Sequence, residues 1–130
     1  MTAPRQGLCE ITGIVVDWLD GQNVTAGLLT LFLRHTSASL LIQENFDQDV
    51  LRDLEDFFAA RAPEEISLYR HTAEGADDMP AHIKSALTQS HLAVPVDDGE
   101  MLLGQYQGIF LFEHRRIPRP REFVVHFEGR

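Results

Sequence analysis

The segment Ala26–His35, AGLLTLFLRH, is an almost continuous apolar run that begins shortly after a turn signal, DGQN, at Asp20–Asn23. A short run of this composition predicts a strand, and its lack of alternation predicts that both of its faces are buried. A second strand is predicted just after it at Ala38–Glu44, ASLLIQE. The fold is therefore expected to be organised around a sheet.

Further strands are predicted on both sides of this pair. Leu8–Leu19, LCEITGIVVDWL, combines β-branched residues with partial alternation and is expected to be a strand. Downstream, His91–Val96 is a strand, Asp97–Glu100 a hairpin turn, Met101–Arg115 one long or broken strand, and Glu122–Gly129 the last strand.

Two segments have helical spacing instead. Asn45–Arg61 repeats apolar residues at helical intervals, with Asn45 or Asp47 as its N-cap and Pro63 beyond its end. A second helix is expected to begin near Asp78, whose side chain would cap it through the Ala81 N–H. Its apolar stripe would comprise Met79, Ile83, Ala86 and Leu87. Together the elements predict an α+β fold, a mostly antiparallel sheet or sandwich with two helices.

Length and composition restrict the function further. The 130 residues predict one domain, 1–130, and the formal net charge of −9 disfavours nucleic acid as a partner. No apolar run is long enough to span a membrane, and the first ten residues do not resemble a signal peptide. Cys9 is the single cysteine, so we expect no internal disulfide and a cytoplasmic location.

Ionisable residues gather just before the second predicted helix. His71, Glu74, Asp77, Asp78 and His82 fall within twelve residues. His82 would lie on the flank of the helix, with Asp78 one turn before it, and a carboxylate beside an imidazole can fix its tautomer. The alternative is a capped helix that follows a hydrated acidic loop.

Two predicted strands end in polar residues. The row Leu29, Leu31 and Leu33 leads to His35, and the next strand ends at Glu44. Thr36 and Ser37 between them offer hydroxyl groups to an anion, although an ordinary hairpin with polar edges explains the pattern equally well.

Four arginines crowd near the C-terminus: Arg115, Arg116, Arg119 and Arg121. They suit either a local anion site or a solvated strand edge. Arg115, which shares a strand face with Glu113, is expected to point into the pocket of this anion site, rather than Arg116. His114 and His126 are expected to be core residues, and His91 a strand-edge residue.

Four segments resemble the YjbQ-type family, also called secondary thiamine-phosphate synthases: HTSASLLIQEN (35–45), YRHTAEGADDMPAHIKSAL (69–87), GQYQGIFLFEHR (104–115) and the closing FEG (127–129). The resemblance implies a compact α+β subunit that forms a homotrimer with a pocket near its interfaces. It also implies a weak synthase activity, which joins a pyrimidine pyrophosphate to a thiazole phosphate and releases pyrophosphate.

This chemistry suggests roles for the residues that match the family motifs. Charge on a departing pyrophosphate must be neutralised by a metal or by cationic side chains. We expect catalytic carboxylates at Glu44, Asp78 and Glu113, phosphate-binding groups at Thr36, Ser37, Lys84 and Arg115, and metal ligands at His35, His71 and His82. The metal would be Mg²⁺ or Zn²⁺, and the partner a small phosphorylated substrate. The alternative function is a non-catalytic trimeric module that binds a small anion or a metal.

Overall fold

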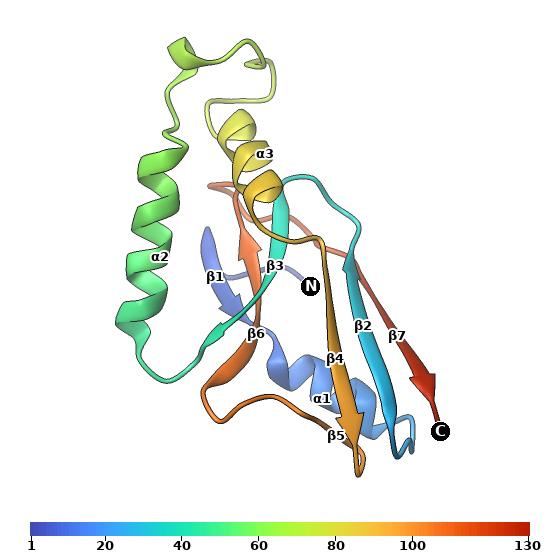
Figure 1. Ribbon diagram of the computed structural model, residues 1–130. Helices are drawn as coiled ribbons and strands as arrows, with labels where there is room; N and C mark the ends of the chain where they lie inside the picture. The colour runs from blue at the N-terminus through green and yellow to red at the C-terminus, as the bar shows by residue number, and fades with distance from the viewer.

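The computed structural model describes all 130 residues as two antiparallel sheets with three α-helices. A three-stranded sheet has the order β1-β6-β3, and a four-stranded sheet has the order β5-β4-β2-β7 (Figure 1). The strands are β1 (Gly7–Glu10), β2 (Gly27–Leu33), β3 (Ala38–Glu44), β4 (His91–Asp97), β5 (Glu100–Met101), β6 (Gln107–Glu113) and β7 (Phe123–Gly129). The helices are α1 (Thr12–Asp20), α2 (Gln48–Arg61) and α3 (Asp78–Leu87), with a 3₁₀ turn at Ile66–Leu68. The α+β class and its antiparallel strands agree with the sequence prediction, whereas the number of helices is three rather than two.

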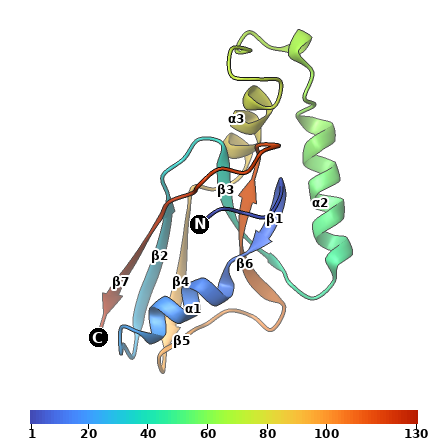
Figure 2. The same cartoon turned by 180° about the vertical axis from the view of Figure 1, so that it is seen from behind.

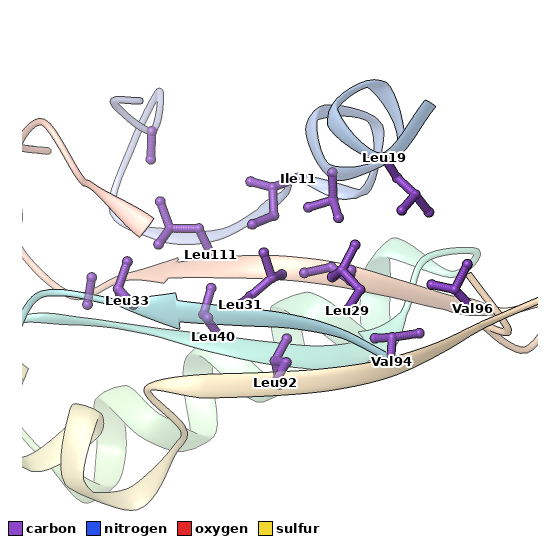
Figure 3. Packing of buried hydrophobic residues seen from close by; sticks show 14 residues of the cluster. Ile11, Leu19, Leu29, Leu31, Leu33, Leu40, Leu92, Val94, Val96 and Leu111 are labelled. Carbon is purple, nitrogen blue, oxygen red and sulfur yellow. The ribbon is translucent and has the colours of Figure 1, made fainter. Parts of the chain in front are cut away.

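One apolar core lies between the two sheets. Leucines and valines of β2 and β4 meet Leu40 of β3 and Leu111 of β6, and Figure 3 shows Ile11 and Leu19 pointing into the same core. A smaller cluster holds α2 on the other face of the three-stranded sheet, where Leu51 packs with Leu8, Phe110 and Phe112. Seen from behind in Figure 2, α2 stands beside β1, and α3 lies near the upper end of β3.

The segment Leu8–Leu19 was predicted as one strand, and this prediction is wrong. The strand β1 ends at Glu10, and α1 begins at Thr12. Ile11, Val15 and Leu19 are buried at intervals of four residues, which is the period of a helix, while Val16 stays exposed. The β-branched composition favoured a strand, but the spacing of the buried side chains, and hence the tertiary packing, gives a helix.

Only one face of β2 is buried, contrary to the prediction. Leu29, Leu31 and Leu33 face the core, whereas Leu28 and Phe32 on the opposite face are 42% and 48% exposed. Apolar residues occupy both faces of this strand, so the sequence does not reveal which row faces the core. The predicted strands at 38–44, 91–96 and 122–129 are confirmed, and 101–115 is a broken strand that contains β6.

The two predicted helix starts have different outcomes. The Asp47 carboxylate accepts the Asp49 N–H at 2.9 Å, which confirms Asp47 as the cap of α2. At α3 the Ala81 N–H bonds the backbone carbonyl of Asp77, so Asp78 is not the cap. The predicted apolar stripe of α3 is also wrong, because Leu87 is exposed and the helix buries Asp78, Pro80, Ala81 and Lys84. The carboxylate of Asp78 is therefore available for other contacts.

The one-sided burial of β2 can be tested by truncation. Leu31→Ala should lower the free energy of unfolding by about 2–5 kcal/mol, because it leaves a cavity in the core. In the dissociated subunit, at low protein concentration, Leu28→Ala on the opposite face should lower it by less than about 1 kcal/mol. Urea denaturation of both variants under these conditions measures the difference. An equal loss in the dissociated subunit would contradict the one-sided burial.

Candidate metal centre and anion pocket

The start of α3 brings two histidines to one carboxylate. Asp78 and His82 lie one helical turn apart, and the loop before the helix carries His71 back to them. Oδ2 of Asp78 lies 2.6 Å from Nε2 of His71 and 3.1 Å from Nε2 of His82. Glu74 joins them, with Oε2 at 3.3 Å from His71 Nε2. One ligand atom from each of these four residues lies within 4.8 Å of the others, so the group could hold a metal ion, and we call this candidate site the metal centre.

Gly75 allows the loop to turn back. Its φ of 107° lies in the left-handed region that favours glycine. A Cβ at this position would also lie 3.1 Å from Oδ1 of Asp77, tighter than an ordinary contact. The glycine thus places Glu74 and His71 beside the helix start.

Arg115 holds the two aspartates at the start of α3 by hydrogen bonds. Its Nη1 donates to Oδ1 of Asp78 at 2.7 Å, and its Nε donates to Asp77 at 2.9 Å. Burial would raise the pKa of Asp78, but the hydrogen bond with His71 and the charge of Arg115 together hold that pKa below its ordinary value. Asp78 is therefore an ionised carboxylate, fixed on one oxygen by Arg115 and open to the two histidines on the other.

The two imidazoles carry protons that a metal would replace. Oδ2 of an ionised Asp78 can only accept, so both Nε2 atoms must donate to it. The hydrogen bond to Asp78 is the main cause that raises the pKa of His71. Two imidazole nitrogens and two carboxylate oxygens suit Zn²⁺ better than Mg²⁺, which prefers oxygen ligands alone.

His35, the third predicted metal ligand, is not among the four residues of the metal centre within the subunit. Its Nε2 accepts the backbone N–H of Glu122 at 2.8 Å, so the ring is the neutral tautomer with its proton on Nδ1. Burial is the main cause that lowers the pKa of His35, and the positive charge of Arg121 lowers it further. His35 nevertheless lines a pocket of about 300 Å³ together with His82.

Two of the three predicted catalytic carboxylates are also elsewhere in the subunit. Glu44 ends β3 about 20 Å from the His35 end of the strand, at ~3.3 Å per residue, and accepts the Asp47 N–H near the start of α2. Glu113 is fully buried and accepts two hydrogen bonds from the guanidinium of Arg121. Only Asp78 belongs to the metal centre.

Arg115 and Lys84 were both predicted to bind phosphate, and both are buried. Arg115 is buried and pairs with Asp77 and Asp78, whereas Arg116 is exposed and pairs with Glu64. The Arg115 guanidinium is already engaged by Asp77, Asp78 and the Glu74 carbonyl, which makes it a positioning residue. Lys84 is buried and lines a separate cavity of about 150 Å³ with Glu55 and Glu113; burial lowers its pKa.

Thr36 and Ser37 do line the largest cavity, of about 740 Å³. Besides these hydroxyls its wall contains His35, Ser90, Arg119 and Arg121, and we call this cavity the anion pocket. Arg119 and Arg121 were not selected from the sequence, although the crowding of arginines near the C-terminus was the signal. His35, Thr36 and Ser90 line both the anion pocket and the pocket beside His82, so the two adjoin.

The remaining histidines differ in burial. His114 is a core residue, as predicted; its Nε2 lies 2.9 Å from the Ser39 hydroxyl, and its buried Nδ1 has no partner. His126 was predicted to be buried but is exposed on β7, and His91 is exposed at the start of β4. Alternation along β7 places His126 on the outer face.

The burial of His114 predicts a dependence of stability on pH. Burial lowers the pKa of His114 from 6.5 to about 3, so below pH 6.5 the unfolded chain takes up a proton that the folded chain excludes. The free energy of unfolding therefore falls as the pH drops below 6.5. At pH 5 the contribution of His114 to this loss is about 2 kcal/mol.

His114→Phe removes this titration and should show a correspondingly smaller loss between pH 7 and 5, measured by urea denaturation. Identical losses in the two proteins would contradict the neutral, buried state of the imidazole.

These features define a class of small antiparallel α+β domain with a candidate metal centre at a helix start. The sequence model described as UPF0047 protein YjbQ-like matches residues 1–130. The chain therefore belongs to the YjbQ/UPF0047 family, as its motifs predicted.

Relatives in the family are similar over most of the chain. A UPF0047 protein of Synechocystis is 57% identical over 82% of this chain and 72% of its own length. The UPF0047 protein YjbQ of Salmonella typhimurium is 45% identical over 97% of this chain and 91% of its own length. Among solved structures, a conserved hypothetical protein from Thermus thermophilus has a TM-score of 0.87 at 37% identity and covers 98% of this chain and 96% of its own. None of the helices here has the length and hydropathy required to cross a membrane.

Proposed function

We propose that this protein is a metal-dependent transferase that joins two small phosphorylated heterocycles in the thiamine-phosphate synthase reaction. The main observation that supports this proposal is the metal centre, where ligand atoms of His71, Glu74, Asp78 and His82 lie within 4.8 Å of one another. The reaction class itself comes from the family resemblance. In it, the thiazole nitrogen forms a bond to the pyrimidine methylene carbon, and pyrophosphate departs with the electron pair of the broken C–O bond.

The chain's own residues have separate parts in this proposal. His71, His82, Asp78 and Glu74 would hold a divalent ion, which would neutralise charge on the departing pyrophosphate. Arg115 keeps Asp78 ionised and oriented through its 2.7 Å hydrogen bond, so the ligand set is arranged before the ion arrives. The hydroxyls of Thr36 and Ser37 donate hydrogen bonds to the phosphorylated substrate. No proton transfer is needed for the bond that forms.

The alternative is a non-catalytic module that binds a metal or a small anion. One observation favours it: Glu44 and Glu113, two of the proposed catalytic carboxylates, are engaged in other contacts. A metal-binding module needs no such groups. The two functions therefore share the metal centre and differ in whether precursors are converted.

The metal centre predicts that freshly purified protein contains about one divalent ion per subunit. His82→Ala should lose at least about tenfold in metal affinity, because it removes a direct ligand. Elemental analysis after dialysis against a limiting zinc buffer measures this. His126→Ala, a matched change of an exposed histidine, should bind metal as the parent protein does. Equal metal contents in the two variants would refute the assigned ligands.

Turnover of the two thiamine precursors separates the functions. The transferase should form thiamine phosphate and pyrophosphate, lose this activity on chelation and regain it when zinc or magnesium is restored. Metal that binds at the centre without product formation under any of these conditions would leave the binding module as the function.

We also propose that the protein is a homotrimer, as the resemblance implies. The exposed apolar side chains Leu28, Phe32 and Val124 on the four-stranded sheet support self-association. Light scattering at micromolar protein should return three times the 14.7 kDa subunit mass. Leu28→Asp should shift the mass toward the monomer, because it places a charge in this apolar patch, whereas Asp97→Asn at an exposed strand end should not. A monomeric parent protein would contradict the proposal.

A further inference from the structure

We infer that the anion pocket binds the phosphate group of a small, soluble phosphate monoester, at a subsite separate from the metal centre. The binding itself requires no metal, but its part in catalysis rests on the proposed function. Arg119 and Arg121, rather than Arg115 and Lys84, are the cations of this subsite.

Arg121 is a fixed hydrogen-bond donor in the pocket wall. It is only 4% exposed, and its Nε donates to Glu113 at 2.8 Å while its Nη2 donates to Glu113 and to the Ser37 carbonyl at 3.0 Å. Its Nη1 has no partner in the chain and is not fully buried. Because Arg121 lines the cavity, this nitrogen is accessible from it. A guanidinium held on two nitrogens and open on the third loses little freedom when it binds an anion.

Arg119 supplies charge that is not neutralised within the chain. Its backbone N–H bonds Glu113, but its exposed guanidinium makes no ion pair, whereas the Arg34 side chain in the same wall pairs with Glu122. The charge of Arg121 is offset by Glu113. Of the cations in the pocket wall, Arg119 is therefore expected to bind an incoming anion most strongly, through charge-assisted hydrogen bonds.

The loop between β2 and β3 adds neutral donors. The bond from the Glu122 N–H fixes the proton of His35 on Nδ1, which leaves that N–H as a donor. The backbone N–H groups of His35, Thr36 and Ser37 have no partner in the chain. Together with the hydroxyls of Thr36, Ser37 and Ser90, these donors suit the oxygens of a phosphate, which accept many hydrogen bonds.

The size and charge of the pocket favour a small organic monoester. Its volume of about 740 Å³ exceeds what a bare phosphate fills, and Phe32 and Leu33 add apolar wall for an organic part. The net charge of −9 repels polyanions and anionic membranes. Because the pocket adjoins the one beside His82, the organic part can extend toward the metal centre. The substrate class is thus a monoester whose reacting end lies away from its phosphate.

Calorimetric titration of metal-stripped protein with phenyl phosphate tests the subsite. Arg119→Gln should raise the Kd at least about tenfold, since it removes the unpaired cation. Arg116→Gln is the matched control; it makes the same change of charge on the same segment, outside the anion pocket, and should change the Kd less than about twofold. Equal effects of the two substitutions, or no binding by the parent protein, would overturn the inference.

A second comparison keeps this inference distinct from the proposed function. His82→Ala should bind phenyl phosphate as tightly as the parent protein, with or without zinc, even if turnover is absent from both. Binding that requires zinc and survives Arg119→Gln would place the phosphate at the metal centre, which overturns the subsite and leaves the metal enzyme intact. Vesicles with phosphatidic acid should not compete with phenyl phosphate; effective competition would overturn the assignment to a soluble ligand.

Discussion

The buried ion pair between Arg115 and the start of α3 is the interaction on which the candidate site depends. Arg115 follows β6, and its guanidinium holds Asp77 and Asp78 with bonds of 2.7 to 3.4 Å. Removing one partner of a buried pair leaves an uncompensated charge, at a loss of about 3–5 kcal/mol. The pair therefore fixes the helix start against the sheet. Asp78 in turn orients both histidines, so the geometry of the metal centre derives from this pair.

The sequence predicted most strands and the longer helix, because alternation and helical spacing record local burial. It failed where composition and tertiary packing disagree. Ile11–Leu19 is rich in β-branched residues, yet its buried side chains recur every four residues in a helix. In β2 both rows are apolar, and only the packing of the second sheet decides that Leu31 is inside and Phe32 outside.

The metal centre was predictable in part for a similar reason. His71, Asp78 and His82 are close in sequence, so a loop and one helical turn suffice to bring them together. His35 belongs to another segment, and sequence spacing contains no information about its distance from them. Arg115 was predicted to bind phosphate because a cation near an anion site and a cation that organises carboxylates look alike in a sequence. Contacts distinguish them: the guanidinium is satisfied within the chain.

Glu113 and Arg115 give the end of β6 a role in both halves of the site. The Glu113 carboxylate accepts the backbone N–H of Arg115 at 3.2 Å, yet the two side chains engage different partners. Arg115 holds the carboxylates of the metal centre, and Glu113 holds Arg121 in the wall of the anion pocket. The end of β6 and the residues just after it thus position side chains in both sites. In the functions proposed above, neither residue contacts a ligand itself; each positions the groups that would.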